Sequence, residues 1–177
     1  PACAHGTGAA PPPRGPHTPR AIRGPPAARG ADAAGDRENH ATLYAGGRLS
    51  FGKMPRYRHA DMDDLEAKLR AVPESAGCLI VTDGVFSMGG DIAKLPEICE
   101  LAARYGARVM VDDAHGLGVI GEGGRGAARP FRVEGEGEGI LGTLSKSRAW
   151  LGGYMGASAL GGGLRSVFTT CAGGVLG

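Results

Sequence analysis

The stretch VMVDDAHGLG at residues 109–118 decides the fold, because an acidic pair and a histidine follow directly after a short β-branched apolar run. Such a run is typical of a buried strand. The stretch GTLSK at residues 142–146 repeats the pattern, with a lone lysine closing a second apolar run. An acid and an imidazole after one strand, and an amine after another, predict a site at the carboxyl edge of a sheet.

The flanking sequence predicts alternating strands and helices. Helical spacing of apolar residues favours helices over 61–70 and 95–105, the second with Pro96 near its start and Gly106 after its end. Short apolar runs predict strands at 78–83, 107–113, 139–143 and 152–158. We therefore expect an α/β fold with a mostly parallel sheet and flanking helices.

The residue types at that edge suit pyridoxal phosphate (PLP). This cofactor withdraws electrons while its ring nitrogen is protonated, and the carboxylate of Asp112 would favour the protonated form. Lys146 would supply the amine that the cofactor aldehyde needs, and His115 would lie near the ring hydroxyl. Taken singly, the acid and the histidine fit a turn equally well, and the lysine fits a solvated surface.

Three longer stretches resemble the α-oxoamine synthases, a family of fold-type I PLP-dependent enzymes. They are DRENHATLYAGGRLSFGKMPRYRHADMDDLEAKL (36–69), VTDGVFSMGGDIAKLPEICELAARYGARVMVDDAHGLGVIGEGGRG (81–126) and GTLSKSRAWLGGYMGAS (142–158). The resemblance implies the central part of the large domain of a fold-type I PLP-dependent transferase. It also implies that Lys146, His115 and Asp112 are catalytic.

The same resemblance implies the cofactor contacts. His40 would stack on the ring, Ser87 would approach the ring hydroxyl, and Thr143 would bond the phosphate. Asp112, His115 and Lys146 complete that set, and no metal ligand is implied. Without the resemblance, Ser87 fits a plain turn serine as well. Asp113 is expected to bond local backbone groups.

The reaction implied is condensation of an amino acid with an acyl-CoA thioester to give an α-amino ketone, in a homodimeric parent. Two alternatives stay open: another fold-type I enzyme such as an aminotransferase, and a non-catalytic fragment. The family pattern also departs here, with Ala45 and Gly89 where acids are usual, and with Arg148 and Trp150 after the lysine. These departures put local folding and substrate choice in question.

The ends differ from the middle in composition. Residues 1–35 hold eight of the 12 prolines and little branched aliphatic surface, so we expect them to be disordered and outside the family pattern. Residues 36–158 would be the partial PLP-binding domain, and 159–177 a short non-family tail. We therefore interpret the chain as a fragment, from a faulty gene model or a frameshift, with little activity by itself.

Charge and composition bear on the binding partners and the cellular location of the protein. A net charge of +2 over 177 residues favours no nucleic-acid partner, and there is no apolar run long enough for a membrane span. The four cysteines are widely spaced, which does not favour disulfides or zinc. We expect a cytoplasmic protein.

Overall fold

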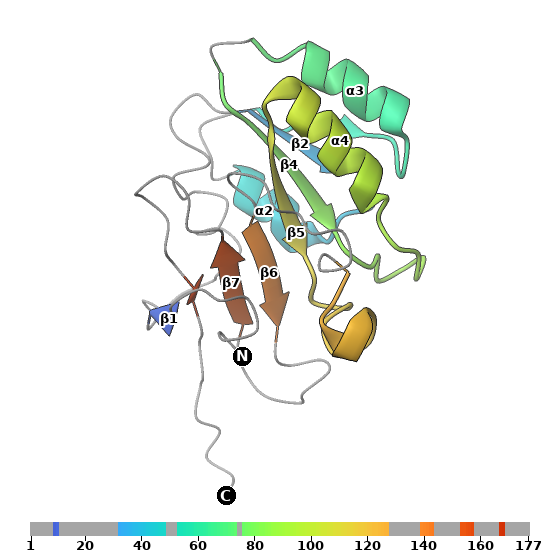
Figure 1. The fold of residues 1–177 in the computed structure, drawn as a ribbon. Helices are drawn as coiled ribbons and strands as arrows, with labels where there is room; N and C mark the ends of the chain where they lie inside the picture. Colours follow the sequence, from blue (N-terminus) through green and yellow to red (C-terminus); the bar gives the residue numbers. More distant parts are fainter. Residues whose placement is uncertain are drawn as a thin grey trace, which may run out of the picture.

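A six-stranded sheet organises the molecule (Figure 1), and its strand order is β3-β2-β4-β5-β6-β7. The computed structural model describes residues 32–48, 53–73 and 76–127 in full, and the backbones of 9–10, 139–143, 153–157 and 167–168. The strands of the sheet are β2 (Asp32–Asp36), β3 (Arg56–Tyr57), β4 (Cys78–Asp83), β5 (Arg108–Asp112), β6 (Gly139–Thr143) and β7 (Gly153–Ala157). The first five are parallel, and β7 runs antiparallel to β6. The mostly parallel α/β sheet predicted from the sequence is confirmed.

Helices cover both faces of this sheet. Helices α3 (Met62–Arg70) and α4 (Leu95–Tyr105) lie side by side on one face, and α2 (Ala41–Arg48) lies behind the sheet in Figure 1. Alternating strand residues therefore enter two separate cores. The core under α3 and α4 includes Ala34, Leu65, Ile80, Leu95, Ile98, Val109 and Val111. The core under α2 consists of Ala33, Leu43, Leu79, Val81 and Met110.

Helices α3 and α4 begin and end where local chemistry dictates. The side chain of Asp61 caps α3 by accepting a hydrogen bond from the Asp64 amide at 2.9 Å, which satisfies a donor that the helix leaves unpaired. Helix α4 has a proline in its first turn and ends at Gly106, whose φ of 62° is left-handed. Glycine adopts this conformation without steric cost. Both helices confirm the sequence predictions.

The outer surfaces of α3 and α4 are joined by a polar network centred on Glu66. One oxygen of Glu66 accepts hydrogen bonds from the Tyr105 hydroxyl at 2.7 Å, from Arg70 at 3.0 Å and from Arg104 at 3.1 Å. Because three donors converge on a single carboxylate, the two helices are held at a fixed spacing over the sheet.

The disorder expected for residues 1–35 is wrong for the last four of them, 32–35. Asp32 begins β2, which lies between β3 and β4, and the Ala33 amide donates to the Lys53 carbonyl at 2.7 Å. Ala33 and Ala34 are buried by apolar residues of neighbouring elements, so a segment with little apolar surface of its own can form a strand. Residues 9–10 also pair, as strand β1 (Ala9–Ala10) with β8 (Val167–Phe168).

Helix α2 was not predicted from the sequence, because the two glycines in ATLYAGGR weaken helix propensity. Leu43, Gly46 and Gly47 are its buried residues, so packing against the sheet outweighs that weakness. Within the described part of the chain, none of the helices is long and apolar enough to cross a lipid bilayer.

Candidate active site

Two buried carboxylates meet at the carboxyl edge of the sheet. Asp83 ends β4, Asp112 ends β5, and the two are register partners in the parallel pair. Both lie in the buried class, with exposed fractions of 5% and 8%. Because burying charge is costly, two adjacent buried acids make this edge of the sheet a candidate site.

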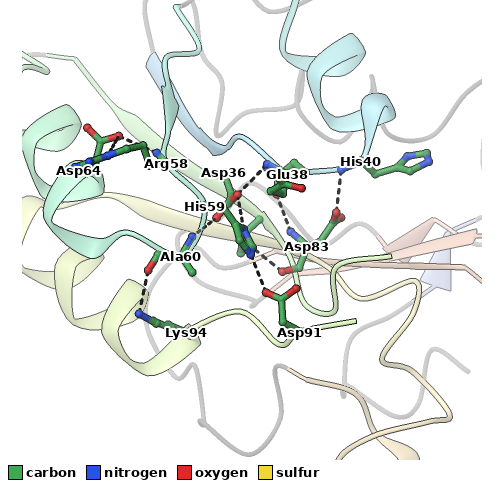
Figure 2. Close-up of polar contacts among 12 residues, drawn as sticks. Asp36, Glu38, His40, Arg58, His59, Ala60, Asp64, Asp83, Asp91 and Lys94 are labelled. Atoms are coloured by element: carbon green, nitrogen blue, oxygen red, sulfur yellow. Dashed lines mark hydrogen bonds and ion pairs between the residues drawn. The ribbon is translucent and has the colours of Figure 1, made fainter. Parts of the chain in front are cut away.

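The segment before α2 is fastened to this edge through its side chains. The Asn39 amide nitrogen donates to the Val81 carbonyl at 2.8 Å, and its oxygen accepts from the Asp83 amide at 3.0 Å. The His40 amide then donates to the Asp83 carboxylate at 2.8 Å, a contact drawn in Figure 2. These three bonds place His40 next to the two acids. Its ring is exposed and lies 2.8 Å from the Thr42 hydroxyl.

The turn after β5 carries the predicted histidine. Asp112 accepts a hydrogen bond from the Ala114 amide at 3.1 Å, which turns the chain immediately after the strand. His115 follows in the same turn and is half-buried. The structure therefore keeps Asp112 and His115 on one short segment at the same edge as Asp83.

Asp113 has the structural role expected for it. Both of its oxygens accept from the Ala127 amide, at 3.2 and 3.0 Å, and so close the loop 114–127. Burial raises the pKa of Asp113 to about 6, against the hydrogen bond from Ala127 that lowers it, and the charge of Asp112 adds to the increase.

Glycines make room for that carboxylate. A Cβ added at Gly116 would lie 2.1 Å from one Asp113 oxygen, and one added at Gly126 would lie 1.7 Å from the other. Gly126 also has a φ of 92°, which disfavours any other residue. The glycine-rich segment after His115 therefore packs closely around the buried carboxylate of Asp113.

Ser87 lies in a hairpin, residues 84–93, that leaves the sheet after β4. The Phe86 amide donates to the Asp91 carbonyl at 2.9 Å, and the Ala93 amide donates to the Gly84 carbonyl at 3.1 Å. Phe86 is buried, whereas Ser87 is exposed in the turn. The hairpin root is thus fixed beside Asp83, and its tip faces solvent.

The lysine side of the site is only partly described. Strand β6 lies parallel to β5, with Asp112 opposite Leu141, so Thr143 ends β6 at the same edge. Lys146 lies outside the described residues, as do the departures Arg148 and Trp150. The structure thus brings Asp112, His115, His40 and the end of β6 to one edge, and the position of Lys146 stays a prediction.

His59 is partly buried, with 29% of its side chain exposed, and its two ion-pair partners were not predicted from the sequence. Figure 2 shows His59 between two carboxylates, with Asp36 at 3.0 Å from Nδ1 and Asp91 at 2.8 Å from Nε2. A single histidine in a loop does not identify partners distant in sequence, so neither Asp36 nor Asp91 could be assigned to His59 from the sequence.

Comparison with known proteins identifies the family. The family model for aminotransferase class I and II matches residues 26–172. The chain belongs to this family. Members of the aminotransferase class I and II family are PLP-dependent, and the match extends past both ends of the motif-bearing range 36–158.

Curated relatives within the family are α-oxoamine synthases, which confirms the resemblance. A serine palmitoyltransferase of Sphingobacterium spiritivorum is 52% identical over 124 residues, which is 70% of this chain and 31% of the relative. An 8-amino-7-oxononanoate synthase of Fervidobacterium nodosum is 54% identical over 123 residues, 68% of this chain and 31% of the relative. The chain therefore spans about 31% of the length of these relatives.

Solved structures of the family agree with the fold. Serine palmitoyltransferase of Sphingomonas wittichii is 39% identical, with a TM-score of 0.68 over 72% of this chain and 32% of that one. A serine palmitoyltransferase of S. paucimobilis with bound PLP and myriocin is 34% identical, with a TM-score of 0.70 over 78% of this chain and 35% of that one. The fold-type I architecture predicted from the sequence is confirmed.

Proposed function

We propose that this chain contributes the cofactor-binding part of a PLP-dependent acyltransferase that joins an amino acid to an acyl-CoA thioester and yields an α-amino ketone. The observation that supports this most directly is the pairing of Asp83 and Asp112 at the carboxyl edge, with the His40 and His115 segments beside them. Its relatives carry the names of enzymes of this class.

The described residues fit the cofactor chemically. Asp112 is a carboxylate that is 8% exposed, which suits a partner for a protonated ring nitrogen in a nearly dry site. Asp112 also lies on the same short segment as His115, which supports it as the ring-nitrogen partner in this proposal. PLP, when bound, supplies an electron sink for the charge that develops at the substrate α-carbon.

Each side chain has a defined task in this proposal. Asp112 would hold a proton on the ring nitrogen of the cofactor, and His40 would present its imidazole to the ring face. Ser87 would donate to the ring hydroxyl, and Thr143 would donate to the phosphate without adding charge. Lys146 would hold the cofactor through its aldehyde until the substrate amine takes its place, and the freed Lys146 amine would then accept the substrate α-proton, while His115 would polarise the acyl carbonyl.

Covalent capture tests the cofactor assignment. The chain is incubated with PLP and reduced with borohydride, and the peptides are then sequenced by mass spectrometry. The expected modification lies on Lys146 and is absent in Lys146→Ala, whereas the matched variant Lys68→Ala retains it. Modification spread evenly over the lysines would contradict the assignment and favour the non-catalytic fragment.

Substrate class is tested on the same protein. Thiol release from acyl-CoAs of increasing length, with glycine, serine or alanine, would identify an α-oxoamine synthase. Amino-group transfer to an oxoacid without thiol release would favour the aminotransferase alternative. A homodimer and a cytoplasmic location belong to this proposal as well, and sedimentation velocity of the purified chain tests the first.

A further inference from the structure

His59 is bonded through both ring nitrogens to carboxylates from two separate segments. Asp36, at the end of β2, lies 3.0 Å from Nδ1, and Asp91, in the hairpin 84–93, lies 2.8 Å from Nε2. An imidazole that donates from both nitrogens is protonated, since neutral imidazole has a single N–H. The two carboxylates thus select the charged form of this ring (Figure 2).

The two partners differ in how firmly they are held. The Asp36 side chain is 2% exposed and accepts two further hydrogen bonds, from the Glu38 amide at 2.9 Å and the Ala60 amide at 3.0 Å. The Asp91 side chain is 44% exposed. When the ring loses one proton, the remaining N–H should stay on buried Asp36, and Asp91 should face a lone pair. The bond to Asp91 is therefore the one that breaks.

The turn that carries His59 has further contacts that do not involve the imidazole Nε2. The Lys94 ammonium donates to the Ala60 carbonyl at 3.0 Å, and the Arg58 guanidinium pairs with Asp61 at 2.9 Å. The ring of His59 also packs edge-on against Phe86, with centroids 4.6 Å apart and an interplanar angle of 84°. Loss of the proton at Nε2 therefore breaks the bond to Asp91 while these contacts of the turn remain.

We propose that His59 is a positioning residue: in its doubly protonated form it fastens the hairpin 84–93 to the sheet edge, and loss of one proton releases the hairpin at Asp91. The importance of this clamp for the cofactor rests on the proposed function, because Ser87 lies in the released segment. The clamp itself is a property of the chain without any ligand.

The direction of the pH effect follows from the surroundings of the ring. The charged groups that contact the ring are Asp36 of β2 and Asp91 of the hairpin, while Lys94 binds the carbonyl of the next residue and Arg58 pairs with Asp61 in the same turn. Partial burial lowers the pKa of His59, but the hydrogen bonds and charges of Asp36 and Asp91 outweigh it and raise the pKa above 6.5. The clamp is complete below 6.5, the ordinary pKa of histidine, and is lost as pH rises through the raised pKa of His59.

Amide hydrogen exchange of the hairpin tests the clamp. The amides of Phe86, Gly90 and Ala93 report hairpin opening, because each donates within the hairpin. After correction for intrinsic rates, we expect their protection to fall about threefold to tenfold between about pH 6 and about pH 9. Asp91→Ala should show the low protection at both pH values, and the matched exposed-acid variant Asp63→Ala should behave as the unmodified chain does.

A second measurement does not depend on hairpin opening. NMR titration of the histidine rings should give a pKa for His59 above 6.5, with the neutral ring protonated at Nδ1, and Asp91→Ala should lower that pKa. The proposal is overturned if hairpin protection is the same in Asp91→Ala and Asp63→Ala, or if the pKa of His59 does not respond to Asp91→Ala.

The link to the cofactor has its own readout. If the clamp positions Ser87, the single substitution Asp91→Ala should weaken PLP binding about threefold to tenfold. The same substitution added to Ser87→Ala should weaken PLP binding no further. A chain that binds no PLP would refute the proposed function, while hydrogen exchange and the histidine titration would still decide whether the clamp exists.

Discussion

Replacing Asp113 with Asn should stabilise the chain at neutral pH and leave its stability unchanged in acid. Asp113 is 1% exposed, and burial raises its pKa from 3.8 to about 6. A folded-state pKa above the unfolded one means that the folded chain binds the proton more tightly. The penalty is therefore absent below about pH 4, grows as pH rises through about 6, and is complete above it.

The size of the effect follows from the shift. About two pKa units correspond to ~3 kcal/mol of stability that the carboxylate costs at neutral pH. Asparagine is neutral throughout and keeps an oxygen that can accept from the Ala127 amide. The free energy of unfolding of Asp113→Asn, minus that of the unmodified chain, should thus increase by ~3 kcal/mol between about pH 4 and about pH 7.

Urea unfolding of both proteins at the two pH values measures this difference directly, and contributions from other titrating groups cancel between them. Asp63→Asn serves as the matched control, because that acid is exposed on α3. A difference that does not change with pH would refute the reasoning, since it would mean that the buried carboxylate carries no charge penalty.

Three further substitutions, one of them with a matched control, test other parts of the fold by urea unfolding. Gly126→Ala should lower the free energy of unfolding by about 3 kcal/mol or more, because position 126 has a φ of 92° and a Cβ there would lie 1.7 Å from an oxygen of Asp113. The control Gly123→Ala, whose Cβ would have its nearest contact at 4.0 Å, should lower it by about 1 kcal/mol. Equal losses of stability in the two variants would contradict the role of the Asp113 carboxylate. Asn39→Ala should cost about 2 kcal/mol, since it leaves a buried carbonyl and a buried amide without partners, and a loss below about 0.5 kcal/mol would refute this. Ala60→Gly should be neutral or stabilise by up to about 1 kcal/mol, because Ala60 has a left-handed φ of 51°, and a clear loss of stability would count against strain at that turn.

The predictable part of the fold was the part with strong local signals. Strand β4 and helix α4 were predicted with the bounds that the structure shows. A short apolar run marks the strand in the sequence, and a proline near the start and a glycine after the end mark the helix. Strand β2 and helix α2 were missed, because alanine and glycine carry little local preference and are ordered here by neighbours distant in sequence.

In the candidate site, too, only the residues with strong local signals could be placed from the sequence. Asp112 and His115 could be placed because a buried strand ends at Asp112, and strand ends converge at one edge of a parallel sheet. The partners of His59 could not be placed, since Asp36 and Asp91 are brought to it by the packing of β2 and the hairpin against one turn. No periodicity in the sequence encodes such a contact.

The side chain of Asn39 continues the backbone ladder of β4 after β2 has stopped pairing at Val81. Its amide group makes the two hydrogen bonds that the backbone of a neighbouring strand would otherwise make to β4. The main chain after β2 can therefore turn away from the sheet without leaving these two groups of β4 unpaired. Only a residue with a donor and an acceptor on one short stem can do this. In a selection over all twenty amino acids at position 39, aspartate would fail for want of the donor and glutamine for its extra length.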